Sequence, residues 1–119
     1  MTGEDRIVAA IAARLVSMRA AHGLIDDCAD LLPAPGQSFV LKTDPVRAGV
    51  HFFPDDDPSD IGWKALAANV SDLAAKAARP VAYLLAVSFN QAPTHQWLEG
   101  LLLGLEKAQD AFGISLVGG

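Results

Sequence analysis

Hydrophobic residues recur at helical spacing in three stretches of the chain, residues 2–21, 57–78 and 94–113. In each stretch the apolar side chains repeat every three or four residues, which places them on one face of an α-helix. Each stretch also begins with a side chain that caps a helix amino terminus well, so three helices are predicted. Their buried faces are predicted to comprise Ile7, Ile11, Leu15 and Met18, then Trp63, Leu66, Val70, Leu73 and Ala77, and finally Leu98, Leu101, Leu102, Leu105 and Phe112.

Short apolar stretches between these helices indicate β-strands. Residues 38–43 follow the turn-forming sequence Pro-Ala-Pro-Gly and are predicted to form a strand, and residues 50–53 a second, short extended piece. Residues 81–89 and 114–117 are predicted to form two more strands, one on each side of the last helix. Helices that alternate with strands predict an α+β or α/β sandwich, with the helices packed on one face of a sheet.

Length and composition limit the class of protein. At 119 residues the chain has the length of one domain, and 51% hydrophobic against 19% charged residues exclude a disordered polymer. A net charge of -5 argues against binding to nucleic acid through a basic face. No apolar stretch is long enough to cross a membrane, and the single cysteine cannot form an internal disulfide. A cytoplasmic protein without nucleic-acid or membrane partners is therefore expected.

The acidic residues are concentrated between positions 26 and 72, where the chain has nine Asp and no Glu. Short carboxylates in one region suit hard cations such as Mg²⁺, although a single Asp is more often a turn or capping residue. Asp27, Asp44 and Asp72 stand out because each lies at the edge of, or within, a predicted element. Asp72 follows Asn69 by three residues, which puts two oxygen-bearing side chains on one helix face. An ion pair with Lys76 is the alternative role of Asp72. The common P-loop motif G-x-x-x-x-G-K-[ST] is absent.

Five short sequences carry a resemblance to a known family: D-D-C-A at 26–29, K-T-D at 42–44, A-G-V-H-F at 48–52, G-W-K-A-L-A at 62–67 and N-V-S-D-L-A-A at 69–75. In order and separation they closely resemble the thiamine-monophosphate kinase family, within the aminoimidazole-ribonucleotide-synthetase-like superfamily. The terminal L-V-G-G is similar to that family's strand leading into a Gly-Gly-Asp motif. The resemblance covers nearly the whole chain but only the N-terminal third of the usual enzyme.

This resemblance implies a fold and an assembly. The family's N-terminal domain is an α+β sandwich, a mixed four-stranded sheet with helices packed on one face. Two such domains pair through their sheets, which implies a homodimer. Residues 1–119 are then expected to form a single N-terminal domain that binds ATP and Mg²⁺ and dimerises, with the family's C-terminal domain absent.

The resemblance also implies an activity, the transfer of the γ-phosphate of ATP directly to thiamine monophosphate to form thiamine diphosphate. Both substrates are polyanions, so an acidic domain is expected to bind them with Mg²⁺ between its carboxylates and the phosphates. The phosphate acceptor is itself an anion, so no catalytic group beyond metal positioning is implied. The residues implied by motif are Asp27, Asp44 and Asp72 as Mg²⁺ ligands, Thr43 as a further contact at the metal, His51 as a contact to thiamine monophosphate and Gly119 as a contact to ATP.

Three places depart from the family's usual pattern. Ile25 ends a Gly-Leu-Ile sequence where Gly-Ile-Gly is usual, Lys42 stands in place of Thr or Ser, and Lys76 is followed by Ala in place of Met-Gly. Two alternatives stay open: a related ATP-dependent enzyme of the superfamily acting on another substrate, and a non-catalytic dimerisation or ligand-binding module. The 119-residue chain alone is predicted to be inactive, because the family's fourth metal-binding carboxylate and the other part of its nucleotide-binding site are expected beyond Gly119.

Overall fold

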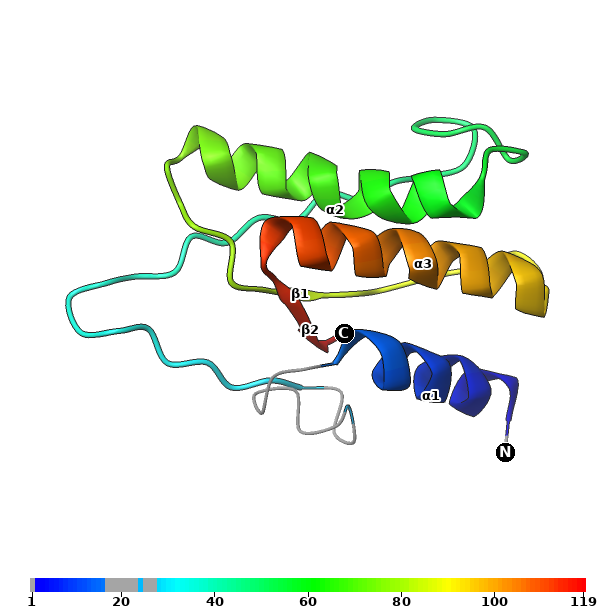
Figure 1. Cartoon of the computed structure of the whole chain (residues 1–119), viewed down its shortest axis with the longest axis horizontal. Helices are drawn as coiled ribbons and strands as arrows, with labels where there is room; N and C mark the ends of the chain where they lie inside the picture. The colour runs from blue at the N-terminus through cyan, green and yellow to red at the C-terminus, as the bar shows by residue number, and fades with distance from the viewer. Residues whose placement is uncertain (1, 17–23, 25–27) are drawn as a thin grey trace.

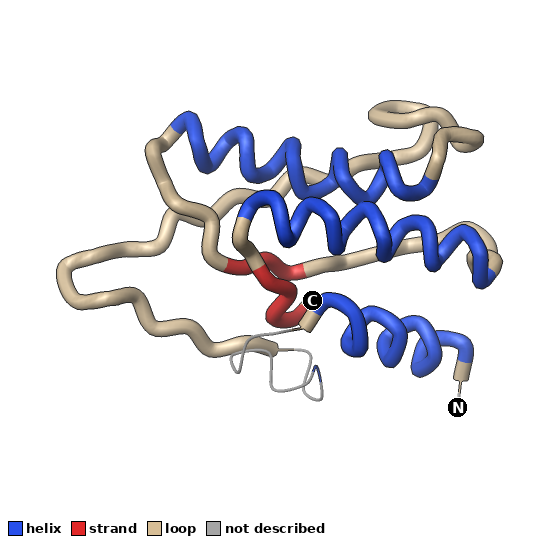
Figure 2. The backbone as a smooth tube through the Cα atoms, in the orientation of Figure 1, coloured by secondary structure: helices blue, strands red, loops and turns tan. Residues whose placement is uncertain are grey.

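A computed structural model describes residues 2–16, 24 and 28–119 of the chain. Within these residues, three helices and two strands occur in the order α1 (Gly3–Leu15), α2 (Pro58–Ala75), β1 (Ala82–Leu84), α3 (His95–Phe112) and β2 (Ser115–Gly118). Figure 1 shows α3 between α2 and α1, with the strands beside it, and Figure 2 shows the long loop that precedes α2. None of the described helices is long and apolar enough to cross a membrane.

Local sequence explains where the helices begin. Thr2 caps α1 through a reciprocal pair of hydrogen bonds: the Asp5 N–H donates to Thr2 Oγ1 at 3.1 Å, and the Thr2 N–H donates to Asp5 Oδ2 at 2.7 Å. Asp57 caps α2 ahead of a proline in the first turn. Thr94 caps α3 by accepting a hydrogen bond from a first-turn N–H at 3.1 Å. The three predicted helix starts are confirmed.

The helix ends agree less uniformly with the sequence. α3 ends at Gly113, whose left-handed backbone (φ 67°) suits glycine, as predicted. α2 ends at Ala75, before the predicted end at residue 78. α1 ends at Leu15 because Val16 is extended (φ -88°, ψ 120°), earlier than the predicted position 21. Residues 17–21 themselves, with the predicted core residue Met18, lie outside the described residues.

Two glycines allow α2 and α3 to approach closely. A Cβ atom added at Gly62 would lie 2.5 Å from the carbonyl oxygen of Leu101 and would force the helices apart. A Cβ atom added at Gly104 would overlap the backbone of Ser59. The backbones of the two helices are therefore in contact at these points. A residue larger than glycine at either position would prevent this contact.

The buried face of α2 differs from the predicted one near the start of the helix and at its end, where Ala77, predicted as a core residue, lies beyond α2 and is exposed. Ile61 and Leu66 are 5% exposed, whereas Trp63, predicted as a core residue, is 40% exposed. The indole of Trp63 packs at the edge of the core, with its ring centroid 5.3 Å from that of Phe112. The apolar pattern of the sequence could not show that Trp63 is exposed. The absence of a side chain at Gly62 allows α3 to pack closely against the face of α2 that carries Gly62.

The core of the molecule is centred on α3. The predicted buried face of this helix is confirmed except at its end, where Phe112 is half-buried. Arg14 fastens α1 to the same helix, with ion pairs of 2.7 Å to Glu99 and 2.8 Å to Glu106. The main buried side chains are Ile11 and Leu15 of α1, Ile61 and Leu66 of α2, Leu98, Leu101, Leu102, Leu105 and Ala108 of α3, and Leu116 and Val117 of β2.

The expected mixed four-stranded sheet with helices on one face is wrong for the described residues. There, β1 and β2 form a two-stranded parallel sheet, with Ala82 opposite Ser115 and Tyr83 opposite Leu116. α3 connects the two strands, as the crossover helix does in a β-α-β unit. Only three of the residues predicted at 81–89 form a strand, and its register with β2 shifts after Tyr83, so that Leu84 lies opposite Gly118.

The other two predicted strands do not form, for separate physical reasons. Residues 38–43 run as an extended loop with Leu41 89% exposed. A strand needs a neighbour for its backbone groups, and this loop is instead bonded to α2 at Asp44. Residues 50–53 lie in a turn: Gly49 is left-handed (φ 77°), and the His51 N–H donates to the Arg47 carbonyl oxygen at 2.8 Å.

Candidate functional site

Asn69 fixes the end of the loop 42–44 to α2. Its Oδ1 accepts a hydrogen bond from the Asp44 backbone N–H at 2.9 Å, and its Nδ2 donates to the Asp44 carbonyl oxygen at 3.1 Å. Nδ2 also donates to the carbonyl oxygen of Ala65, one turn earlier in α2, at 2.9 Å. These bonds orient the amide and hold both backbone groups of Asp44, so the Asp44 carboxylate starts from a defined point beside α2.

Lys42 links two of the predicted metal-binding carboxylates. Its Nζ lies 2.7 Å from Asp44 Oδ2 and 3.0 Å from Asp72 Oδ2. Asp72 is on the same face of α2 as Asn69, three residues further along. Hydrogen bonds to Asp44 and then to Asp72 raise the pKa of Lys42, so this side chain stays charged at neutral pH. Within the described residues, the ion pair of Asp72 is thus made with Lys42 and not with Lys76.

His51, the predicted substrate contact, is exposed in the turn that follows this loop. Its Nδ1 accepts a hydrogen bond from the Arg47 backbone N–H at 3.0 Å, so the proton of the neutral ring is on Nε2. The ammonium of Lys64 donates to the His51 carbonyl oxygen. The turn therefore presents Nε2 as the hydrogen-bonding atom of the imidazole that is left for a ligand.

Lys64 and Asn69 together attach the segment 44–51 to α2. They stand five residues apart, which corresponds to about 7.5 Å along a helix. Asn69 holds the segment at Asp44 and Lys64 holds it at His51. Lys42 and Asp44 therefore lie beside Asp72, and the turn with His51 is attached to α2 at Lys64, although these residues come from separate parts of the sequence.

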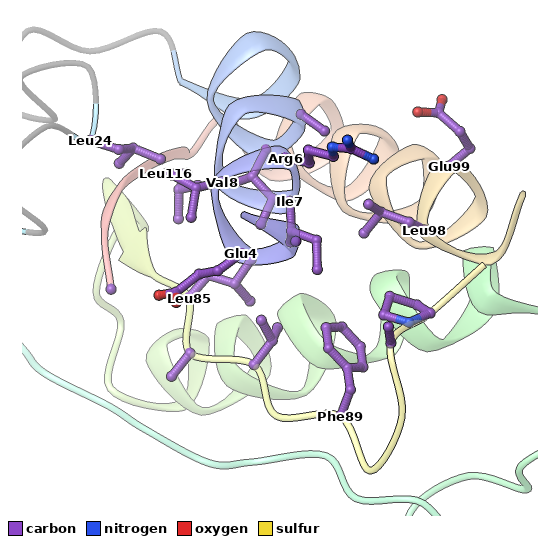
Figure 3. Close-up of a pocket in the computed structure, with 18 of the residues that line it drawn as sticks. Glu4, Arg6, Ile7, Val8, Leu24, Leu85, Phe89, Leu98, Glu99 and Leu116 are labelled. Carbon is purple, nitrogen blue, oxygen red and sulfur yellow. The ribbon is translucent and has the colours of Figure 1, made fainter. Parts of the chain in front are cut away.

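Gly119, the predicted ATP contact, lies elsewhere. It follows β2 and lines a cavity of about 960 Å³ between α1, the segment after β1 and the start of α3. Figure 3 shows Ile7 of α1, Leu98 of α3 and Phe89 around this cavity, whose lining is mostly apolar. Neither Asp44 nor Asp72 is part of the lining. The structure therefore does not bring Gly119 together with the acidic residues on α2.

The described residues do not complete a metal site by themselves. Among them, no group of three or more His, Cys, Asp or Glu side chains is placed to hold a metal ion. Asp44 and Asp72 converge, but on the ammonium of Lys42, and Thr43 beside them is exposed. Asp27 lies outside the described residues, so the predicted ligand set is brought together only in part.

Sequence reasoning missed Lys64 as a residue that positions the loop. The available signal was that Lys64 is the single basic residue within α2, in a stretch otherwise rich in Ala and Leu. It also missed the contact that Asn69 makes with Asp44, although it placed Asn69 and Asp72 on one face. Neither contact follows from local spacing, because the partners are separated by long stretches of chain.

The structure thus describes a small helix-rich domain with a two-stranded parallel sheet, presenting two carboxylates and a lysine on one side of α2. Comparison with protein families shows that the chain belongs to the AIR synthase related protein, N-terminal domain family, with a match over residues 25–119. The resemblance to that superfamily, inferred from the five motifs, is confirmed.

Individual relatives narrow the comparison to one named enzyme. The chain is 38% identical over 119 residues to the thiamine-monophosphate kinase of Salmonella typhimurium, covering 98% of this chain and 36% of that protein. It is 40% identical over 97 residues to the thiamine-monophosphate kinase of Escherichia coli K12, covering 82% and 30%. The same-named protein of Caulobacter vibrioides is 41% identical over 96 residues, covering 81% and 27%. The chain spans about a third of the length of these curated relatives.

Proposed function

We propose that this chain is the N-terminal part of a kinase that transfers the γ-phosphate of ATP to thiamine monophosphate and forms thiamine diphosphate. One observation carries the proposal: relatives named thiamine-monophosphate kinase are 38–41% identical to the chain over most of its length. Thiamine monophosphate and ATP are the substrates that this name implies. The proposal concerns a protein longer than these 119 residues, since the relatives are about three times as long.

The side of α2 described above supports a role at the phosphates. The acceptor is a phosphate anion, so the reaction needs charge compensation and alignment more than proton removal. Asp44 is held by Asn69 and faces Asp72 across an ammonium, which gives a group of alternating charges where the loop 42–44 meets α2. In the proposal, Nε2 of His51 donates a hydrogen bond to thiamine monophosphate from the turn fixed by Lys64.

Mg²⁺ belongs to the proposal as the ion that accompanies ATP. The residues proposed to face it are Asp27, Thr43, Asp44 and Asp72, of which the described ones do not form a complete site. We therefore assign no catalytic step to an ion resident on these residues. Gly119 is proposed to contact ATP from the cavity beside β2, and the apolar lining there suits a nucleotide base better than its phosphates.

The proposal includes a homodimer formed through the sheet. Within the described residues β1 is paired on one side only, and Leu84 on this strand is 65% exposed, followed by Val87 at 44%. An unpaired strand edge with apolar side chains is a surface that a second copy of the chain covers well. A cytoplasmic location stays a prediction from the sequence, which shows no export or membrane segment and has a single cysteine.

Product formation tests the proposed activity. We expect no thiamine diphosphate from ATP, Mg²⁺ and thiamine monophosphate with the 119-residue chain alone, because losing part of an electrostatic site costs about a hundredfold or more per contact. The same segment within a chain of the relatives' full length should form the product, as detected by chromatography. His51→Ala in that longer chain should raise the KM for thiamine monophosphate more than the KM for ATP.

Three results would contradict the proposal. Turnover by the 119-residue chain alone would show that the site is misplaced. A longer chain that phosphorylates another acceptor but not thiamine monophosphate would favour a related enzyme of the superfamily. A longer chain that binds ATP without transferring phosphate to any acceptor would favour a binding or dimerisation module.

A further inference from the structure

The cavity beside β2 is enclosed by elements that are distant in the sequence. Figure 3 shows it between α1 on one side and the segment 85–93 on the other, with the start of α3 beside it. Its volume of about 960 Å³ lies in the upper part of the range for small-molecule sites, about 300–1,000 Å³. One of its walls, α1, lies outside the residues 25–119 that the family match covers. The cavity is therefore large enough for a nucleotide-sized ligand, which α1 would contact.

The segment that follows β1 passes along this cavity with free backbone groups. The Leu85 N–H donates to the Gly118 carbonyl oxygen at 2.9 Å, where the pairing of the two strands ends. Among the described residues, the backbone groups of residues 86–88 have no hydrogen-bond partner. Ala86 and Val87 both line the cavity. Neighbouring N–H and C=O groups of this kind can bind the edge of a planar heteroaromatic ring, which carries donors and acceptors of its own.

Phe89 adds an aromatic ring to the same side of the cavity. The side chain is half-buried, and its ring centroid lies 5.8 Å from that of Trp97, at an interplanar angle of 88°. This edge contact restricts the orientation of the Phe89 ring. Because aromatic side chains stack on nucleic-acid bases, Phe89 favours a flat ring as the ligand over an aliphatic molecule.

The charged side chains around the cavity are unevenly placed. Glu99 lines the cavity but is already ion-paired with Arg14 at 2.7 Å. Figure 3 shows Glu4 toward the segment after β1 and Arg6 toward α3. Arg6 is exposed and has no ion pair within the described residues. The free charge on the α3 side of the opening is therefore positive, which suits a ligand with a negatively charged group there.

We propose that this cavity binds an adenine nucleotide through its base, with the free backbone of residues 86–88 along the edge of the base and Phe89 stacked on its face. Arg6 of α1 then meets the phosphate next to the ribose. A helix outside the matched family region thus takes part in selecting the nucleotide. That the nucleotide is ATP rests on the proposed kinase function, but binding of an adenine nucleoside in the cavity is measurable without turnover.

Titration of the 119-residue chain with adenosine, followed by NMR of its backbone amides, tests the position and the affinity. We expect the signals of Ala86 and Val87 to shift and that of Asp72, on α2, to stay in place. Phe89→Ala should weaken binding at least about fivefold. Phe89→Leu, which keeps an apolar side chain, should weaken it as well. Phe53→Ala is the matched control, since Phe53 is 72% exposed and does not line the cavity.

Other ligands test which part of the nucleotide is recognised. Inosine has the donor and acceptor on the edge of its base exchanged, so it should bind about fivefold or more weakly than adenosine. AMP should bind the parent about threefold more tightly than adenosine, and Arg6→Met should lose this difference. Lys107→Met, which removes an exposed charge from α3, is the control for Arg6→Met and should keep it.

Several results would overturn the inference. Adenosine that shifts no amide of residues 86–88 does not bind in this cavity. Equal binding of adenosine, inosine and indole would show an apolar pocket that does not recognise the base. If Phe89→Ala folds poorly, Phe89→Leu and the comparison of ligands on the parent still decide the question.

These measurements fail separately from the proposed function. Selective adenosine binding that depends on Phe89 supports the inference even if the longer chain makes no thiamine diphosphate. Absence of adenosine binding overturns it even if the longer chain is an active kinase.

Discussion

Asn69 is the residue on which the attachment of the loop 42–44 depends most directly. One amide makes three hydrogen bonds, two to the backbone of Asp44 and one within α2. Because both backbone groups of Asp44 rely on this side chain, a residue without an amide cannot replace it. Alanine would leave the loop attached mainly through the ion pairs of Lys42, which are partly exposed and weak in water.

We expect Asn69→Ala to lower the free energy of unfolding by about 1–2 kcal/mol, since it removes hydrogen bonds worth roughly 1 kcal/mol or less each at a partly exposed site. Urea unfolding followed by circular dichroism measures the change. Asn90→Ala, in the exposed segment before α3, is the matched control and should change the stability little. Equal losses for the two variants would show that Asn69 does not hold the loop.

Tyr83 is a residue whose ionisation reports on folding. Its hydroxyl donates to Oε1 of Gln109 at 2.7 Å, and burial raises its pKa above the ordinary value of 10.0. Because the folded pKa lies above the unfolded one, this contribution to stability is fully present below about pH 10. It is lost as the pH rises from there through the folded pKa.

We therefore expect Tyr83, the single tyrosine of the chain, to show no tyrosinate absorbance until the protein unfolds at alkaline pH. Tyr83→Phe should lose about 1 kcal/mol at neutral pH, because Gln109 is left without its donor. The difference in stability between parent and variant should shrink above about pH 10. A tyrosinate band that rises near pH 10 while the fold is intact, as judged by circular dichroism, would refute this.

At the scale of elements, the packing of α2 on α3 depends on the absence of side chains at Gly62 and Gly104. A Cβ at Gly104 would meet the backbone of Ser59, which cannot move aside as a flexible side chain would. The two helices would have to separate along much of their length. This contact also determines which face of α2 remains available to bind the loop with Asp44.

We expect Gly104→Ala to destabilise the fold by roughly 1–3 kcal/mol, despite the better helix propensity of alanine, because overpacking dominates. The urea midpoint of unfolding measures the loss. Gly3→Ala is the control, since a Cβ there has no neighbour within 4 Å, and its stability should be unchanged or slightly raised. A Gly104→Ala protein as stable as Gly3→Ala would mean that α2 and α3 are not in backbone contact.

At the scale of the whole molecule, the exposed edge of β1 is the surface proposed to pair with a second copy. We expect sedimentation to show a dimer at about 100 μM chain, since weak association needs high concentration. Leu84→Lys places a charge on this edge and should give a monomer, because Leu84 is 65% exposed and lies on β1. Leu103→Lys, on α3, is the control and should stay dimeric. A parent that is monomeric at that concentration would rule out the dimer.

Local signals in the sequence predicted the helices well. The capping side chains Thr2, Asp57 and Thr94 each act on the next three residues, so their effect is readable without knowing the fold. Gly113 ends α3 for the same reason. The buried face of α3 followed from periodicity, because Leu98, Leu101, Leu102 and Leu105 recur at helical spacing and are all buried.

The sequence by itself thus determined the starts of the helices, the core face of α3 and, through its motifs, the family to which the chain belongs. Only the tertiary structure decided which extended segments pair into a sheet, since a strand forms by finding a distant partner and the segment 38–43 is bonded to α2 instead. It also decided the exposure of Trp63, which follows from how closely Gly62 lets α3 approach. The tertiary structure likewise decided that Lys42 lies between Asp44 and Asp72, because this contact joins a loop to a helix that is distant in the sequence.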